Sequence, residues 1–311
     1  MNNGASDAPV LIDSWQGHQR WGEPKLDANH PAVTPQRVQF ASLRDAVMTK
    51  EWGHPKGNHL ALLIHAFYPE QMEQMLQPLA SHQMSHGHRI DLYVSTPGEK
   101  FDLVCHILKQ QQWPTVKIFG VVNCGRDVTP FLLHLLPSAQ YNGHKFFVKV
   151  HTKASPHLEK QSRQAWSQHL TKSLLTPNAI ELIQQHLHAD PLLGIVAPSG
   201  CLMSISLTLH KNYEHLMNML RQSSMQGDWA LQQYFIAGSM FAGRLKALEL
   251  EKQSMIDTLW SEQEEGKTDG TISHALERWL SLMAIQHGWK IAELPGQTNE
   301  NLPGFGYQRI K

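Results

Sequence analysis

Cysteine, an excess of one charge and long apolar runs are all scarce in this 311-residue sequence. The 3 cysteines form no CxxC pair, which argues against a disulfide framework or a thiolate zinc site and fits a reducing compartment. Lys plus Arg and Asp plus Glu both total 27, so no basic field draws the chain to nucleic acid.

The sequence also lacks a basic start followed by an apolar run, and no later stretch approaches the roughly 18 apolar residues of a membrane span. We therefore expect a cytoplasmic protein without a transmembrane segment or a nucleic-acid partner. Peripheral association with the inner face of the membrane stays open.

Hydrophobic residues make up 41% of the chain, enough to bury the core of one large domain. Residues 1–57 are rich in Pro, Gly, Asn and His, with a short helix expected only at 41–50, so we predict an N-terminal extension followed by a domain over 58–311. The 20 histidines are scattered, and the ordinary imidazole pKa of about 6.5 predicts a rising net charge as the pH falls.

Strand and helix patterns alternate from Leu60 onward. This alternation predicts an α/β fold with a mostly parallel sheet flanked by helices. Extra helices are expected in the C-terminal half, interrupted by a strand and turn, with a last amphipathic helix closed by Gly288. The expected strands lie at 60–69, 89–97, 115–122, 144–150 and 194–198, and the expected helices at 70–85, 100–111, 128–136, 162–174, 178–188 and 273–287.

Five ordered segments resemble motifs of the rhamnan synthesis protein F family of bacterial surface-polysaccharide enzymes. The resemblance implies a GT-A-like, Rossmann-type sheet that binds a nucleotide sugar at the carboxyl ends of its strands. The segments are HAFYP (65–69), NCGRDVTPF (123–131), VHTKASPH (150–157), GSMFAGR (238–244) and DGTISHALER (269–278).

The resemblance implies that donor-binding residues come from the first three segments. An aromatic of HAFYP would stack on the base of the nucleotide, although a packed core aromatic fits equally. Asp127, after the turn at Gly125, would hold donor hydroxyls or cap the following helix, or do both. The donor-binding set is His65, Phe67, Tyr68, Asn123, Gly125, Arg126, Asp127, His151, Lys153 and Ser155.

GT-A enzymes usually carry an Asp-x-Asp metal site, but this sequence has His151 and Lys153 at the comparable positions. A Lys or a protonated His can offset diphosphate charge, so we predict transfer without a cofactor, with Mg²⁺ or Mn²⁺ not favoured. Two alternatives stay open: His151 as a single metal ligand, and both residues as polar positions where a buried strand reaches solvent.

The last two segments would supply the acceptor side and the base. Gly238, Ser239, Met240 and Arg244 are candidates for acceptor or phosphate binding, with a structural ion pair as the alternative for Arg244. The resemblance implies that the carboxylate base is Glu277, on a helix whose Leu280 and Met283 face the core. Asp269 and His274 are the alternative catalytic residues, and a solvated face is the alternative for Glu277 itself.

The resemblance implies a glycosyltransferase that moves a hexose or deoxyhexose, such as rhamnose, from a nucleotide sugar to a lipid-linked or oligosaccharide acceptor of a surface polysaccharide such as O-antigen. The carboxylate base implies an inverting mechanism. The alternative from another class is a noncatalytic glycan-binding or assembly module of a polysaccharide synthase.

Overall fold

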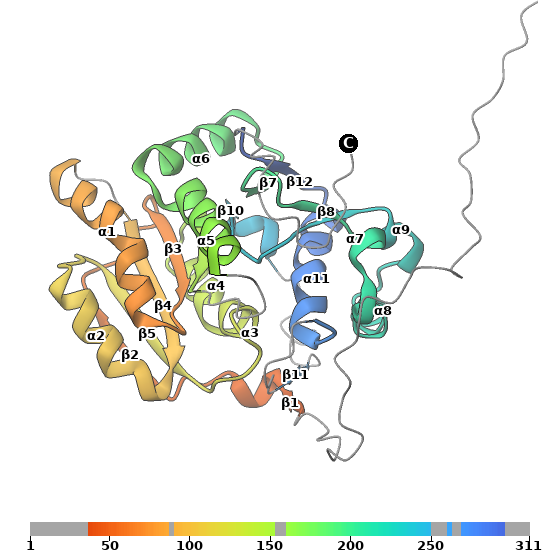
Figure 1. Ribbon diagram of the computed structural model, residues 1–311, viewed down its shortest axis with the longest axis horizontal. Helices are drawn as coiled ribbons and strands as arrows, with labels where there is room; N and C mark the ends of the chain where they lie inside the picture. The colour runs from red at the N-terminus through yellow and green to blue at the C-terminus, as the bar shows by residue number, and fades with distance from the viewer. Residues whose placement is uncertain (1–36, 87–89, 153–159, 250–259, 263–268, 296–311) are drawn as a thin grey trace, which may run out of the picture. The chain divides into compact units, whose positions relative to one another are not determined.

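An eight-stranded mixed sheet forms the centre of the protein (Figure 1). The computed structural model describes residues 37–86, 90–152, 160–249, 260–262 and 269–295. The strands follow the order β12, β7, β10, β6, β3, β4, β5, β2. Their bounds, in chain order, are β2 Met48–Trp52, β3 Leu60–His65, β4 Ile90–Pro97, β5 Val116–Val121, β6 Phe146–His151, β7 Leu193–Ala197, β10 Phe241–Arg244 and β12 Lys290–Glu293.

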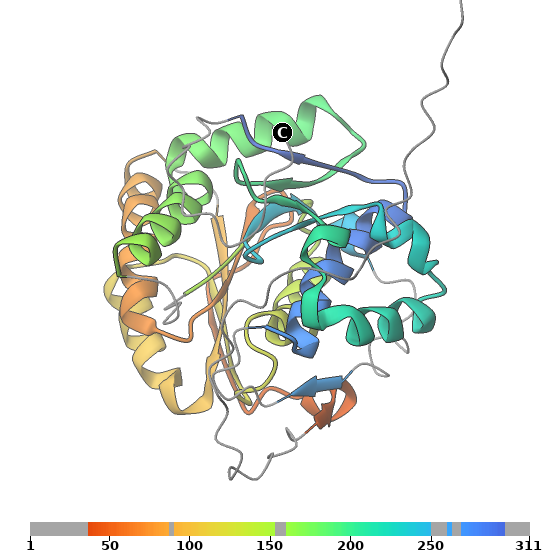
Figure 2. The ribbon, with the colours of Figure 1, turned by 45° about the vertical axis from the view of Figure 1, so that its right-hand side comes forward.

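Helices cover both faces of this sheet (Figures 1 and 2). One face carries α1 (Pro69–His86), α2 (Phe101–Gln110), α5 (Lys160–Leu175) and α6 (Pro177–Ala189). The other carries α11 (Ile272–Gln286) and a continuous segment of α3 (Val128–Pro130), a π-helical turn (Phe131–Leu135) and α4 (Leu136–Tyr141). The predicted α/β class with a mostly parallel sheet is therefore confirmed.

The C-terminal half adds the expected extra helices around α11. These are α7 (Ile205–Thr208), α8 (Tyr213–Gln222) and α9 (Gly227–Leu231), of which α8 packs directly on α11. Two small antiparallel sheets complete the described elements: β1 (Arg37–Gln39) with β11 (Trp260–Glu262), and β8 (Leu202–Ser204) with β9 (Tyr234–Ile236). Short 3₁₀ turns lie at Phe40–Leu43, Gly98–Lys100, His210–Asn212 and Leu245–Leu248.

The central parallel strands are buried, and their sequences are largely apolar. All six residues of β3 and all eight of β4 are buried, as expected for strands covered by helices on both faces. On α11 the expected core positions Leu280 and Met283 are 3% and 4% exposed. The helix ends before Gly288, whose φ of +82° is the left-handed conformation of a helix C-cap.

Strand register brings several polar residues to one edge of the sheet. His65 at the end of β3 lies opposite Ser95 of β4 on one side and His151 of β6 on the other. β10 runs antiparallel between β6 and β7, so β7 and β12 run in the same direction as β3, β4, β5 and β6. The carboxyl ends of these six strands therefore share one edge, which we call the carboxyl edge.

The expected helix at 41–50 is wrong. Residues 40–43 form a single 3₁₀ turn, and Met48–Trp52 form β2, which pairs antiparallel with β5 at the end of the main sheet. The boundary at residue 57 stays a prediction, although β2 lies within the range assigned to the extension. Among the described helices, none is both long and apolar enough to cross a membrane.

Candidate functional site

A buried ion pair forms the centre of the carboxyl edge. The Lys149 ammonium on β6 donates to Asp127 Oδ2 at 2.5 Å, to the Ser239 carbonyl at 2.6 Å and to Ser239 Oγ at 2.8 Å. Ser239 Oγ also donates to Asp127 Oδ2, at 2.8 Å, and His151 Nδ1 lies 3.3 Å from the same oxygen. We call Asp127, His151, Lys149 and Ser239 the edge cluster.

Charge and burial act against each other on Asp127. Burial alone would raise the pKa of the carboxyl, but His151, Lys149 and the Lys149 hydrogen bond outweigh it and hold the pKa well below its usual range. The side chain makes no hydrogen bond that caps α3, so the expected capping role is not observed. Its contacts with the rest of the edge cluster all use Oδ2, which leaves Oδ1 to accept a bond from a ligand hydroxyl.

His65, at the end of β3, lies opposite His151 of the edge cluster. Its Nδ1 lies 3.0 Å from Ser95 Oγ, and burial is the main reason that its pKa is lowered to about 4. The ring is therefore neutral at pH 7. The backbone carbonyl of His65 accepts a hydrogen bond from the Thr152 amide, and Thr152 Oγ1 accepts one from the Tyr68 amide. These bonds connect the ends of β3 and β6.

The loop after β5 brings Arg126 to the N-terminal turn of α11. Gly125 and Arg126 are both left-handed, with φ of +70° and +54°, and Arg126 is exposed. Its Nη1 donates to His274 Nε2 at 3.0 Å, while His274 Nδ1 donates to Thr271 Oγ1 at 2.7 Å. Burial is the main cause that lowers the His274 pKa to about 4, and the Arg126 charge adds to it. A neutral His274 thus holds an exposed guanidinium in place.

Glu277 lies on the next turn of α11, and its carboxylate is oriented by the 238–239 turn. Its Oε1 accepts the Gly238 amide at 2.6 Å, and its Oε2 is 3.9 Å from Arg278 Nη1. The side chain is 16% exposed. Because Gly238 and Ser239 are adjacent, the Glu277 and Asp127 carboxylates are held by successive residues of one turn. Asp269 instead accepts a bond from Asn212 Nδ2 at 2.7 Å.

The aromatic pair after β3 is half-buried. Phe67 and Tyr68 make an edge-to-face contact at 4.9 Å, and the Lys100 ammonium lies 3.9 Å from the Phe67 ring centre. The same ammonium donates to the Phe67 carbonyl at 2.6 Å. Lys100, which the sequence reasoning did not single out, therefore occupies one face of Phe67, where a nucleotide base was expected to stack.

Arg244 lies away from this site, which corrects its expected role. Because β10 is antiparallel to β6, Arg244 pairs with Phe146 at the start of that strand, at the opposite edge of the sheet. Its guanidinium donates to the backbone carbonyls of Leu193, Leu187 and Asp190. Met240 is 1% exposed, and its side chain belongs to the core.

Lys149 is the main site residue that the sequence reasoning missed. All residues of β6 are buried, and the sequence of such a strand does not show which partner neutralises a Lys within it. Asn123 is exposed, whereas the predicted Lys153 and Ser155 lie outside the described residues. Among the described residues, no three His, Cys, Asp or Glu side chains are grouped to hold a metal ion.

The fold and the edge cluster define an α/β protein of the Rossmann-like class with a charged site at the carboxyl edge of its sheet. The chain belongs to the rhamnan synthesis protein F family, which it matches over residues 26–289. The family name links this group to the synthesis of a polysaccharide, rhamnan.

Two curated relatives come from Xanthomonas campestris pv. campestris, one of them from strain B100, and both are named uncharacterized protein WxcX. Each is 28% identical to this chain over 231 residues, which cover 74% of this chain and 32% of the relative. The chain thus spans about a third of the length of the curated relatives it matches.

Proposed function

We propose that this chain is a glycosyltransferase of the GT-A type, acting in polysaccharide biosynthesis. It transfers a hexose or deoxyhexose, such as rhamnose, from a nucleotide sugar to a lipid-linked or oligosaccharide acceptor. Family membership supports the biological role. The observation that carries the chemistry is the pair of carboxylates, Glu277 and Asp127, held by successive residues of the 238–239 turn.

In this proposal Glu277 is the general base. Its carboxylate is oriented by the Gly238 amide yet 16% exposed, so it is fixed in direction and open to an acceptor hydroxyl. Glu277 takes the proton of the acceptor hydroxyl, whose oxygen attacks the anomeric carbon on the face opposite the diphosphate. The bond from that carbon to the diphosphate breaks, so the reaction inverts the anomeric configuration. Asp127 Oδ1 accepts a hydroxyl of the donor, since its Oδ2 is occupied by Lys149 and Ser239.

The diphosphate leaving group needs positive charge near it. Arg126 supplies an exposed guanidinium whose planar donors suit phosphate oxygens, and His274 holds it beside α11. His151 lies at the inner end of the same region, against Asp127. We therefore propose that the Arg126 guanidinium, together with the His151 imidazole, stabilises the leaving diphosphate and that transfer does not require a divalent metal.

Thermal denaturation with nucleotide sugars tests this function. Purified protein is heated with a panel of UDP-, dTDP- and GDP-sugars, each with EDTA and with Mn²⁺. A donor at 100 times its Kd adds about 2.7 kcal/mol to the free energy of unfolding, which gives a clear rise in Tm. A rise with one nucleotide class that survives EDTA supports the proposal; a rise that requires Mn²⁺ contradicts its metal-independent part.

A noncatalytic glycan-binding or assembly module is the second candidate. The coverage of the relatives favours it, since this chain matches only 32% of their length, as one part of a larger synthase would. Release of free nucleotide in the presence of a glycan acceptor separates the two functions. Binding of a glycan without stabilisation by any nucleotide sugar would favour the module.

A further inference from the structure

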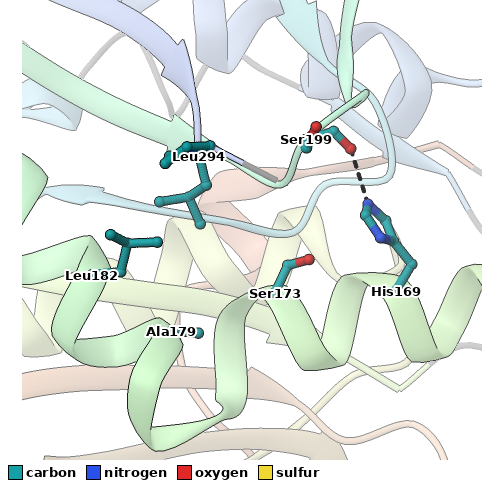
Figure 3. Close-up of a pocket in the computed structure, with 7 residues that line it drawn as sticks. His169, Ser173, Ala179, Leu182, Ser199 and Leu294 are labelled. Atoms are coloured by element: carbon teal, nitrogen blue, oxygen red, sulfur yellow. Dashed lines mark hydrogen bonds between the residues drawn. The ribbon is translucent and has the colours of Figure 1, made fainter. Parts of the chain in front are cut away.

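A cavity lies at the carboxyl edge of the sheet, apart from the residues of the edge cluster. It is a cavity of about 220 Å³ between α5, α6 and the segments that follow β7 and β12 (Figure 3). Because a water molecule occupies about 30 Å³ of liquid, this volume holds a ligand of several heavy atoms. The lining residues are His169, Ser173, Ala179, Leu182, Ser199, Leu294 and Pro295.

One wall of the cavity is polar and has unused hydrogen-bonding capacity. His169 Nε2 donates to the Ser199 carbonyl at 2.9 Å (Figure 3), so this nitrogen is already bonded and Nδ1 is the other polar atom of the ring. The Ser173 and Ser199 hydroxyls make no hydrogen bond within the described residues. Ser199 is 8% exposed and lines the cavity, so a ligand that enters the cavity can reach its hydroxyl.

The opposite wall is apolar and comes from Leu182, Ala179 and Leu294. No charged side chain is among the lining residues that the structure describes, so the cavity offers nothing to neutralise a phosphate. A small ligand with hydroxyls on one side and C–H groups on the other matches both walls. A single pyranose ring of an uncharged sugar has this character.

A chain of contacts connects the cavity to Glu277. The His169 ring stacks on Trp166, with ring centres 5.9 Å apart. Trp166 in turn packs on the 238–239 turn, because its Cζ2 lies 3.4 Å from the place a Cβ of Gly238 would occupy. The Gly238 amide holds the Glu277 carboxylate. Trp166 is 3% exposed, so these contacts run through buried side chains and couple the cavity wall to the turn that holds Glu277.

We propose that this cavity binds one uncharged sugar residue of the acceptor glycan, an inference that rests on the proposed transferase function. The Ser173, Ser199 and His169 groups bind its hydroxyls, and Leu182 with Leu294 contacts its C–H face. The donor binds elsewhere, at the edge cluster, so occupancy of the two sites is separable by experiment.

Saturation-transfer NMR with a panel of methyl glycosides, including methyl rhamnoside and methyl glucoside, tests the proposal. Ser173→Leu fills the cavity, and Ser199→Ala removes a hydroxyl without adding volume. The matched control is Gln168→Leu, which adds the same side chain to an exposed position of the same helix. We expect a signal for at least one glycoside, at least tenfold weaker binding in Ser173→Leu, weaker binding in Ser199→Ala, and no change in the control.

Nucleotide-sugar stabilisation of the same variants keeps the two proposals apart. If every variant retains its nucleotide response while Ser173→Leu and Ser199→Ala both retain glycoside binding, the cavity is not the sugar site and the transferase function survives. Absence of any glycoside signal beside an intact nucleotide response has the same meaning. If a glycoside binds and depends on Ser173 but no nucleotide binds, the sugar site stands and the transferase function fails.

Discussion

The Lys149 ammonium is buried on a strand yet fully hydrogen-bonded, and this explains how the centre of the site tolerates a charge. It is 1% exposed, and its three donors reach Asp127 and two oxygens of Ser239. A buried ion pair adds little net stability relative to an apolar pair of similar size. Removing one partner is costly, however, because the other charge is then buried without compensation. The pair therefore holds β6, the loop after β5 and the 238–239 turn together, and it adds little net stability.

Replacement of one partner should reveal this dependence. We expect Asp127→Asn to lower the free energy of unfolding by about 3 to 5 kcal/mol, because Lys149 is left charged and buried. The double variant Asp127→Asn with Lys149→Met should recover part of the loss. Urea denaturation measures all three proteins, and a double variant less stable than Asp127→Asn alone would contradict the argument.

The surface ion pair of Asp190 with Lys290 is the matched control for this series. These atoms are 3.0 Å apart, but the side chains are 38% and 58% exposed. Water screens and solvates such a pair, so Asp190→Asn should leave the urea midpoint nearly unchanged.

A second residue-scale prediction concerns the base. Glu277→Gln keeps an oxygen for the Gly238 amide but cannot take a proton, so turnover should fall by about 10² to 10⁴ while nucleotide-sugar binding stays intact. Asp269→Asn is the comparison, because the Asp269 carboxylate is engaged by Asn212. Wild-type turnover in Glu277→Gln together with loss of turnover in Asp269→Asn would move the base to Asp269.

The sequence motifs predict most of the polar residues at the carboxyl edge. They do not predict Lys149, the partner that holds Asp127 and Ser239 in position. Asp127, His151 and Ser239 were named from motifs, and all three lie in the edge cluster. Lys149 was missed because the pattern of a buried strand says nothing of a single neutralised charge inside it. Whether these residues bind a donor remains a prediction.

At the scale of the element, the reversed direction of β10 decides which parts of GSMFAGR reach the site. β10 enters the sheet at the carboxyl edge, so Gly238 and Ser239 before it face the cluster, while Arg244 at its end lies at the other edge. Entry requires a tight reversal, in which Gly238 and Ser239 have φ of +89° and +54°. A four-residue sequence does not show in which direction its strand runs. The sequence therefore did not place Arg244 at the edge opposite the cluster.

This reversal predicts a position-specific effect of Gly238→Ala. The new side chain carries left-handed strain of about 1 to 2 kcal/mol and contacts Trp166 at 3.4 Å, so both stability and turnover should fall as the Glu277 anchor shifts. Gly143→Ala is the matched control: its φ is +75°, but a Cβ there meets nothing within 4 Å. Comparable Tm losses with turnover reduced only in Gly238→Ala would fit; reduced turnover in both would not.

Helices and central strands were predictable because their periodic or continuous apolar patterns reflect burial. α1, for example, was expected at 70–85 and spans Pro69–His86. β2 was not, because it is an edge strand with four exposed residues and one half-buried residue in Met48–Trp52, so no apolar alternation marks it. The fold is thus predictable from sequence where burial imposes an apolar pattern. It is not predictable at the solvent-facing edge strand, which has no such pattern.

For the whole molecule, histidine burial controls the response to acid. The sequence predicts a net charge that rises as the pH falls through about 6.5. In the fold, burial is the first cause of lowered pKa values for His65, His134, His144 and His274, with His65 and His274 at about 4. These rings resist protonation while the chain is folded and accept it when the chain unfolds.

The sign of the resulting pH dependence follows from linkage. A folded pKa below the unfolded value means that the unfolded chain binds more protons, so stability is complete above about pH 6.5 and declines as the pH falls toward 4. We expect the free energy of unfolding of the wild type to fall across this window, with His65 alone accounting for about 3 kcal/mol. Urea denaturation at pH 7.5, 6, 5 and 4 measures the slope.

Two variants assign the slope to burial of the His65 ring rather than to its hydrogen bond. His65→Asn removes the titrating group, so the fall in stability from pH 6.5 to 4 should shrink by the His65 share. Ser95→Ala removes the hydroxyl 3.0 Å from Nδ1 but leaves the ring buried, so stability should drop at every pH while the slope stays near that of the wild type. A flat profile in Ser95→Ala would mean that the hydrogen bond with Ser95 sets the slope. An unchanged profile in His65→Asn would mean that other groups govern acid unfolding.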